Sequence, residues 1–141
     1  MKIPEDLKKR LLNEFDFCIE RIQEEEHVRK KLYYFSGTYG VIERVMRFHL
    51  DPQLLMVHAV LNMCYGGLIG LVESRQRGDI AREMPPNLSE MLVDYLTELR
   101  DALSENKDTY KILEKFIALG YRASGSGYYT TEIFERRKKK K

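Results

Sequence analysis

The feature that most constrains the fold is an uncharged run of 21 residues, from Pro52 to Val72, in a chain of which 33% of residues are charged. As a helix, about 20 apolar residues are long enough to span a bilayer. The same pattern is typical of the central helix of a soluble bundle, covered by neighbours on all sides. Gln53, His58 and Asn62 lie within the run, and polar side chains are uncommon in a lone membrane span. We therefore expect a soluble, buried core helix.

Helical periodicity in the N-terminal part predicts amphipathic structure that needs a partner. Apolar residues recur at spacings of three and four from Leu7 to Phe35, which indicates one helical face. The acidic cluster Glu24–Glu26 interrupts that face. The segment from Pro4 to Phe35 is therefore either one long helix or two helices with a kink. Ser36–Gly37 is the expected stop.

Four further helices are expected after this segment, at about residues 38–49, 52–77, 88–103 and 108–120. Asp51, Asn87 and Asp108 are placed as N-caps, and Gly78 and Gly120 as C-terminal stops. The connections are mostly short, which favours antiparallel neighbours. We therefore predict an all-α fold, an antiparallel bundle of about five helices around the central uncharged helix.

The end of the chain differs in composition from the rest. Ser124–Gly127 alternates serine with glycine, which predicts a flexible linker. The chain then ends in six cations, Arg136, Arg137, Lys138, Lys139, Lys140 and Lys141. We expect one helical domain at residues 1–120 and a flexible linker and basic tail at residues 121–141, separable from the fold. The tail carries +6, so residues 1–135 carry −4 against a net charge of +2. The basic balance of the chain therefore comes from the tail, which weakens the argument that the body binds nucleic acid.

The N-terminus and the two cysteines bear on the compartment. Charged residues begin at Lys2, so we expect no signal peptide. Cys18 and Cys64 lie in apolar helical patterns, which predicts small buried hydrophobes rather than a disulfide. Both observations fit a reducing, cytoplasmic compartment.

Three glycines near the end of the uncharged run need an explanation. Gly66 and Gly70 share a helical face, with Gly67 beside them. Glycine inside a helix costs about 1 kcal/mol relative to alanine, and close approach of another backbone is the usual compensation. The glycines therefore mark a close helix contact, either with another helix of this chain or at a subunit interface.

An acidic stripe, Asp94, Glu98, Asp101 and Glu105, lies on the helical face opposite a row of leucines. Glu98-x-x-Asp101 resembles half of the magnesium site of helical nucleotide pyrophosphohydrolases, and Glu24-x-x-His27 matches half of a di-iron carboxylate motif. The sequence supplies neither second half. We expect a solvated outer face or a docking surface for a basic segment such as the tail, with no catalytic residue, metal or cofactor.

One cluster mixes cations with aromatic residues. Arg29, Lys30 and Lys31 precede Leu32, Tyr33, Tyr34 and Phe35, and proteins that bind single-stranded nucleic acid combine these residue types. Leu32 and Phe35 suit the core, whereas Tyr33 and Tyr34 cannot both be buried on one helical face. These cations and the tail are the candidate contacts to nucleic acid.

The chain resembles a family of short, uncharacterised archaeal helical proteins over about its central third. The residues that carry the resemblance are Leu61–Met63 with Tyr65, Gly78–Asp79, Pro85–Pro86 and Tyr95–Leu96. The resemblance implies a cytoplasmic, all-helical domain and carries no activity.

Three functions follow as hypotheses from these patterns. The first is a non-enzymatic helical module that interacts with further copies of itself. The second is an accessory nucleic-acid-binding protein that uses the tail and Arg29–Lys31. The third is a metal-dependent hydrolase, which would need a complete cluster of acids. No membrane partner is expected.

Overall fold

The protein is described by a computed structural model of residues 1–76 and 84–124. These residues form five helices and contain no strand: α1 Glu5–Glu24, α2 Val28–Met46, α3 Pro52–Gln76, α4 Leu88–Ser104 and α5 Tyr110–Ser124. The predicted all-α bundle of about five helices is thus confirmed. The basic tail and the predicted stop at Gly78 lie outside the described residues.

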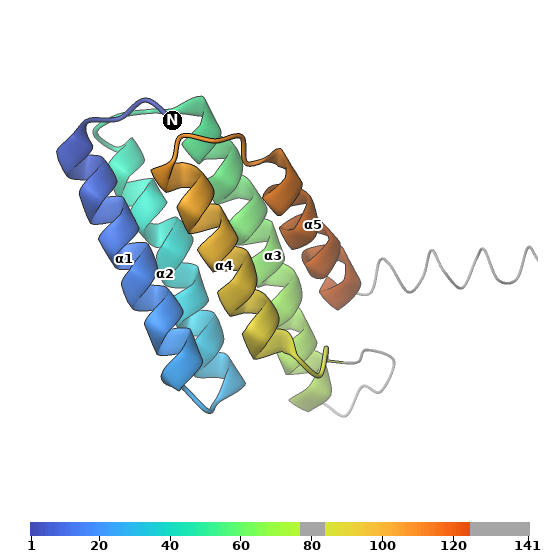
Figure 1. The fold of residues 1–141 in the computed structure, drawn as a ribbon. Coiled ribbons are helices and arrows are strands. Elements are labelled where there is room, and N and C mark those ends of the chain that lie inside the picture. The colour runs from blue at the N-terminus through green and yellow to red at the C-terminus, as the bar shows by residue number, and fades with distance from the viewer. Residues whose placement is uncertain (77–83, 125–141) are drawn as a thin grey trace, which may run out of the picture.

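The five helices pack side by side in a closed ring (Figure 1). Around the ring the order is α1, α2, α3, α5 and α4, and α4 returns to α1. Four of the five neighbouring pairs are antiparallel, as predicted. The exception is α3 with α5, which run in the same direction, because an odd number of helices in a ring forces one parallel pair. Contacts of Gln53 with Thr109 and of Gly67 with Gly120 fix this parallel register.

The N-terminal segment is two helices, not one. Between them Glu25 has an extended backbone (ψ 140°), and so does His27 (ψ 127°). The carbonyl of Ile22, in the last turn of α1, accepts a hydrogen bond of 2.7 Å from the Lys31 ammonium. A cation there satisfies a carbonyl left free at the helix end and opposes the negative end of the dipole. The predicted interruption at the acidic cluster is therefore a full break.

The predicted stop at Ser36–Gly37 is wrong, because α2 runs through it to Met46. A Cβ added at Gly37 would lie 3.0 Å from the Cys18 sulfur of α1. The glycine therefore serves the close approach of two neighbouring helices rather than a helix end. The separate helix predicted at residues 38–49 is the second half of α2.

The start of α3 follows the sequence prediction. The Asp51 Oδ1 accepts the Leu54 amide at 3.0 Å, as an N-cap side chain does. Its Oδ2 accepts the Lys2 amide at 2.8 Å, so the same carboxylate also anchors the N-terminal segment that precedes α1. Burial by itself would raise the pKa of the Asp51 carboxyl. The pKa nevertheless lies below its usual value, because the effect of burial is smaller than that of the groups that favour the charged carboxylate. These groups are the backbone amides of Lys2, Leu54 and Gln53 and the positive N-terminal amine.

The expectation that neighbours cover the uncharged helix on all sides is wrong. Among the described helices, only α2 and α5 pack closely against α3, and 33% of its most apolar stretch is buried. One side of the helix carries buried Leu54, Val57 and Leu61, whereas the opposite side faces outward. By length and composition the helix from Pro52 to Ser74, with a mean hydropathy of 1.7, is also long and apolar enough to cross a membrane.

The last two helices agree with prediction at their starts more than at their ends. Asn87 precedes α4, although its side chain makes no capping hydrogen bond. The Asp108 Oδ1 accepts the Tyr110 amide at 3.0 Å at the start of α5. Gly120 does not end α5, which continues to Ser124 with Ala123 buried. Residues 121–124 therefore belong to the bundle rather than to a linker.

Candidate interaction surfaces

The outward side of α3 is an exposed surface without charge over most of its length. We call the residues Leu55, Met56, Ala59, Asn62 and Gly66 the α3 outer face; all five are exposed. Leu55 is 51% exposed and Met56 is 41% exposed. Scattered exposed apolar residues are ordinary on a protein surface. Here they follow one side of one helix for three turns, which is the pattern of an interaction surface.

The three candidate interface glycines of α3 have different surroundings. A Cβ on Gly67 would lie 2.4 Å from the carbonyl oxygen of Gly120, so this glycine is the contact point of α3 with α5. A Cβ on Gly66 would meet nothing within 4 Å. Gly70 is half-buried. The close contact within the chain thus accounts for Gly67 but not for Gly66, which belongs to the α3 outer face.

Polar and aromatic side chains border this face on the α2 side. The Nε2 of His58 lies 3.8 Å from the Oε2 of Glu43. Tyr39 meets His58 and Tyr65 edge to face, with ring centroids 5.6 and 5.9 Å apart. Burial, and then the proximity of Tyr65 and Glu43, raises the pKa of the Tyr39 hydroxyl. Sequence patterns missed this cluster, because its members are spaced for no known motif.

Large apolar side chains are also exposed at the end of the bundle where α3 begins. Phe48 is 76% exposed and Leu50 is 75% exposed in the connection between α2 and α3. At the start of α5, Tyr110 is 60% exposed and lines a shallow groove of about 310 Å³ together with Met56. Phe48 lies within the helix expected at about residues 38–49. The helix instead ends two residues earlier, at Met46, so the ring projects outward.

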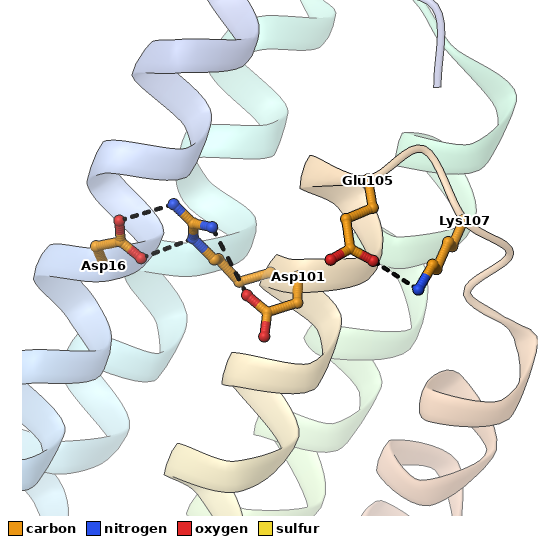
Figure 2. Close-up of polar contacts among 5 residues, drawn as sticks. Asp16, Asp101, Glu105 and Lys107 are labelled. Carbon is orange, nitrogen blue, oxygen red and sulfur yellow. Dashed lines mark hydrogen bonds and ion pairs between the residues drawn. The ribbon is translucent and has the colours of Figure 1, made fainter.

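The predicted acidic stripe, Asp94, Glu98, Asp101 and Glu105, lines a groove of about 700 Å³ between α4 and α5. The α5 side supplies cations that the sequence pattern did not pair with the stripe. The Nζ of Lys115 lies 2.8 Å from the Oε2 of Glu98, and the Nζ of Lys107 lies 2.6 Å from the Oε2 of Glu105. The hydrogen bond from Lys107 lowers the pKa of the Glu105 carboxyl. Figure 2 shows the Glu105–Lys107 pair beside Asp101.

Arg100 links the acidic stripe to α1. Its Nε and Nη2 donate to the two carboxylate oxygens of Asp16 at 2.9 and 3.2 Å, and its Nη1 lies 3.6 Å from Asp101. These carboxylates stand on either side of the guanidinium in Figure 2. The hydrogen bond to Asp16 is the main cause of the raised pKa of Arg100. Partners within the chain therefore already engage three of the four predicted docking residues. Within residues 1–76 and 84–124, no three His, Cys, Asp or Glu side chains gather as a metal site requires.

The predicted cation and aromatic cluster is divided between surface and interior. Lys31 donates to the Ile22 carbonyl at 2.7 Å and to the Ser89 hydroxyl at 2.9 Å, so this ammonium ties the α1–α2 connection to α4. Lys30 and Arg29 are exposed, and Arg29 takes part in other interactions. Of the three cations predicted to contact nucleic acid, Lys31 is therefore already bound by one partner in α1 and one in α4.

The aromatic part of this cluster includes a residue that sequence analysis missed. Phe17 of α1 is 50% exposed and Tyr33 is 70% exposed. Tyr34 lies between them, with ring centroids 6.3 Å from Phe17 and 5.3 Å from Tyr33. Arg21 stands 5.3 Å above the Phe17 ring. Phe17 precedes Cys18 of the buried face, and only the packing of α1 on α2 places it beside the tyrosines.

Both cysteines are buried and free, as predicted. Burial, with a contribution from Glu14, raises the pKa of the Cys18 thiol to about 11. Burial raises the pKa of the Cys64 thiol to about 12. Both thiols are therefore protonated at neutral pH, the form that does not react as a nucleophile.

No protein-family model, no curated protein and no solved structure matches this chain. The resemblance to short archaeal helical proteins therefore stays an expectation, and the interpretation of these surfaces depends on their physical chemistry.

Proposed function

We propose that this protein is a non-enzymatic, cytoplasmic interaction module that self-associates through the α3 outer face. The observation that carries the proposal is the exposure of an apolar helical face with no charged residue between Pro52 and Val72. The centres of protein interfaces are depleted in charge, and a charge beside a twofold axis would lie next to its own copy and be repelled. Ala59 and Gly66 are small, which supports close approach of a second helix.

The size of the face indicates a weak to moderate association. A helix of 25 residues is about 37 Å long and about 10 Å wide. One side of α3 over its whole length therefore offers on the order of 400 Å², and the α3 outer face is only part of it, whereas a stable interface buries about 800 Å² per partner. Side chains that border the face, such as Tyr39 and Phe48, have to contribute the remainder. We expect a dissociation constant in the micromolar range.

Sedimentation velocity over a dilution series tests this proposal. Ala59→Glu places a charge at the centre of the α3 outer face, and Ala118→Glu makes the same change at an exposed position of α5. We expect the native chain and the Ala118→Glu variant to dimerise with rising concentration. The Ala59→Glu variant should stay monomeric with an unchanged helical circular dichroism spectrum. A native chain that is monomeric at every concentration, or an Ala59→Glu variant that dimerises normally, would refute the proposal.

A second candidate function is accessory binding of single-stranded nucleic acid. The exposed rings of Phe17, Tyr33 and Tyr34 favour it, because bases stack on aromatic side chains irrespective of sequence. Arg21 and Lys30 are the neighbouring cations, although Glu24 lies 3.9 Å from Arg21 and reduces their field. The tail would add six positive charges.

Fluorescence anisotropy with random single-stranded RNA distinguishes the two candidates. If this surface binds RNA, Tyr33→Ala should weaken binding, and Tyr121→Ala, at a residue 54% exposed on α5, should not. Binding that depends on salt and on the tail but is indifferent to Tyr33 would be electrostatic attraction alone. Such a result would leave the aromatic surface without this role.

A further inference from the structure

Along the chain, the exposed charged residues that immediately flank the α3 outer face have opposite signs, Arg47 before and Glu73 after. The Nη2 of Arg47 lies 3.7 Å from the Oε1 of Glu43, but the Arg47 side chain stays 71% exposed, so its guanidinium has donors left for a second carboxylate. At the other end Glu73 is exposed and comes eleven residues after Asn62. Eleven residues make three helical turns, so Glu73 lies on the same side as Asn62. The helix dipole has the same polarity, positive at the start and negative at the end.

Charge and dipole together discriminate between the two ways of pairing this helix with its copy. In a parallel pair around a twofold axis each residue faces its own copy, so Arg47 meets Arg47 and Glu73 meets Glu73. In an antiparallel pair Arg47 of one copy approaches Glu73 of the other, and the dipoles are opposed. Like charges in direct apposition oppose association, whereas complementary charges at the rim fix the register.

Asn62 marks the centre of such a pair. It is the midpoint of the uncharged run from Pro52 to Val72, so the overlap of two antiparallel runs is greatest when the axis passes beside it. Its side chain is exposed and, within the described chain, makes no hydrogen bond. Two amides across a twofold axis can each donate to the other, and one such buried pair is sufficient to specify register. With this centre, Ala59 lies at the level of residue 65 of the second copy, one residue from Gly66, so small residues approach each other on both sides of the axis.

We propose that two copies of this chain pair through antiparallel α3 helices, with the two Asn62 side chains beside the twofold axis and Arg47 of each copy next to Glu73 of the other. This inference rests on the self-association proposed above and adds its partner geometry.

Distances between spin labels test the orientation directly. His49→Cys introduces an exposed thiol at the end of the bundle where α3 begins. The native thiols are buried and protonated at neutral pH, so the label attaches to the new cysteine. In an antiparallel pair the two Pro52 positions lie about 30 Å apart along the axis, and the labels are at least that far apart. In a parallel pair they are at the same end, within about 20 Å.

Charge reversal tests the ion pair. The twofold axis repeats each pair twice, so Arg47→Glu or Glu73→Arg alone should weaken dimerisation about tenfold. The two reversals combined should restore the dissociation constant to within about threefold of the native value. Glu114→Arg, at an exposed position of α5, is the control for an unrelated charge change and should have no such effect.

The outcomes separate this inference from the function on which it rests. A dimer with long label distances and rescue by the double reversal supports both. A dimer with short distances, or one in which the double reversal is no better than the single changes, overturns the antiparallel arrangement and leaves self-association intact. A chain that never dimerises overturns both.

Discussion

Two adjacent glycines of α3 should respond in opposite directions to the same substitution. At Gly66 an added Cβ meets nothing within 4 Å, whereas at Gly67 it would lie 2.4 Å from the Gly120 oxygen and 3.2 Å from its carbonyl carbon. The latter atoms belong to the backbone of α5, so no side chain can rotate away. Gly67→Ala must therefore separate α3 from α5, and Gly66→Ala leaves the packing unchanged.

The magnitudes follow from two opposing terms. Alanine is about 1 kcal/mol better than glycine inside a helix, and Gly66→Ala gains this term in full. Overpacking of a close contact costs about 1–3 kcal/mol, and the upper part of that range, about 2–3 kcal/mol, applies at Gly67 because the contacted atoms are backbone. We therefore expect Gly66→Ala to raise the free energy of unfolding by about 1 kcal/mol. Gly67→Ala should lower it by about 1–2 kcal/mol after the propensity gain is subtracted.

Urea denaturation followed by circular dichroism measures both values. The two substitutions are compared in the Ala59→Glu background, so that association through the α3 outer face does not contribute to stability. Equal stabilisation by both alanines would refute the contact between Gly67 and Gly120. Equal destabilisation would show that Gly66 also packs within the chain.

Three further predictions concern single side chains. Asp51→Ala should lower the free energy of unfolding by about 1–2 kcal/mol at pH 7 through loss of the cap. The folded pKa of Asp51 is lowered, so the stability that its carboxylate contributes is fully present above the unfolded pKa of about 3.9. This stability is lost as the pH falls through the folded pKa. The free energies of unfolding of the native chain and the variant should therefore converge in urea titrations at low pH. Lys31→Met should cost about 1–2 kcal/mol in the same assay, whereas Lys30→Met at the exposed neighbour should change stability by less than about 0.5 kcal/mol. Cys18 and Cys64 should resist alkylation at neutral pH and react once urea unfolds the chain, as mass spectrometry would show.

Local patterns in the sequence were sufficient for most of the fold. Periodicity located the helices, and the cap Asp51 was identified correctly because a short side chain before an apolar run satisfies free amides. Asp108 also accepts an amide of the first turn of α5, although it precedes the cap position, Thr109, by one residue. The errors fall at Gly37 and Gly120, which were interpreted as helix stops. Both are sites where one helix meets another, and a contact between distant segments leaves no local signal beyond the glycine itself.

The candidate surfaces were less predictable because exposure depends on the arrangement of all five helices. The composition of α3 suggested complete burial, and only the ring order, which leaves α3 with α2 and α5 as neighbours, reveals its open side. Likewise, the lysines that neutralise Glu98 and Glu105 come from or precede the next helix, α5. Phe17 joins Tyr34 through the packing of α1 on α2, a contact between residues that share no motif.

Hydroxyl-radical footprinting at low and high protein concentration tests whether two copies meet through the α3 outer face. Leu55 and Met56 are exposed on this face, and Tyr33, 70% exposed on α2, is the reference. We expect oxidation of Leu55 and Met56 to fall as sedimentation shows the dimer forming, while oxidation of Tyr33 stays constant. Unchanged oxidation of Leu55 and Met56 in a sample that is fully dimeric would contradict this expectation, because the copies would then meet through another surface.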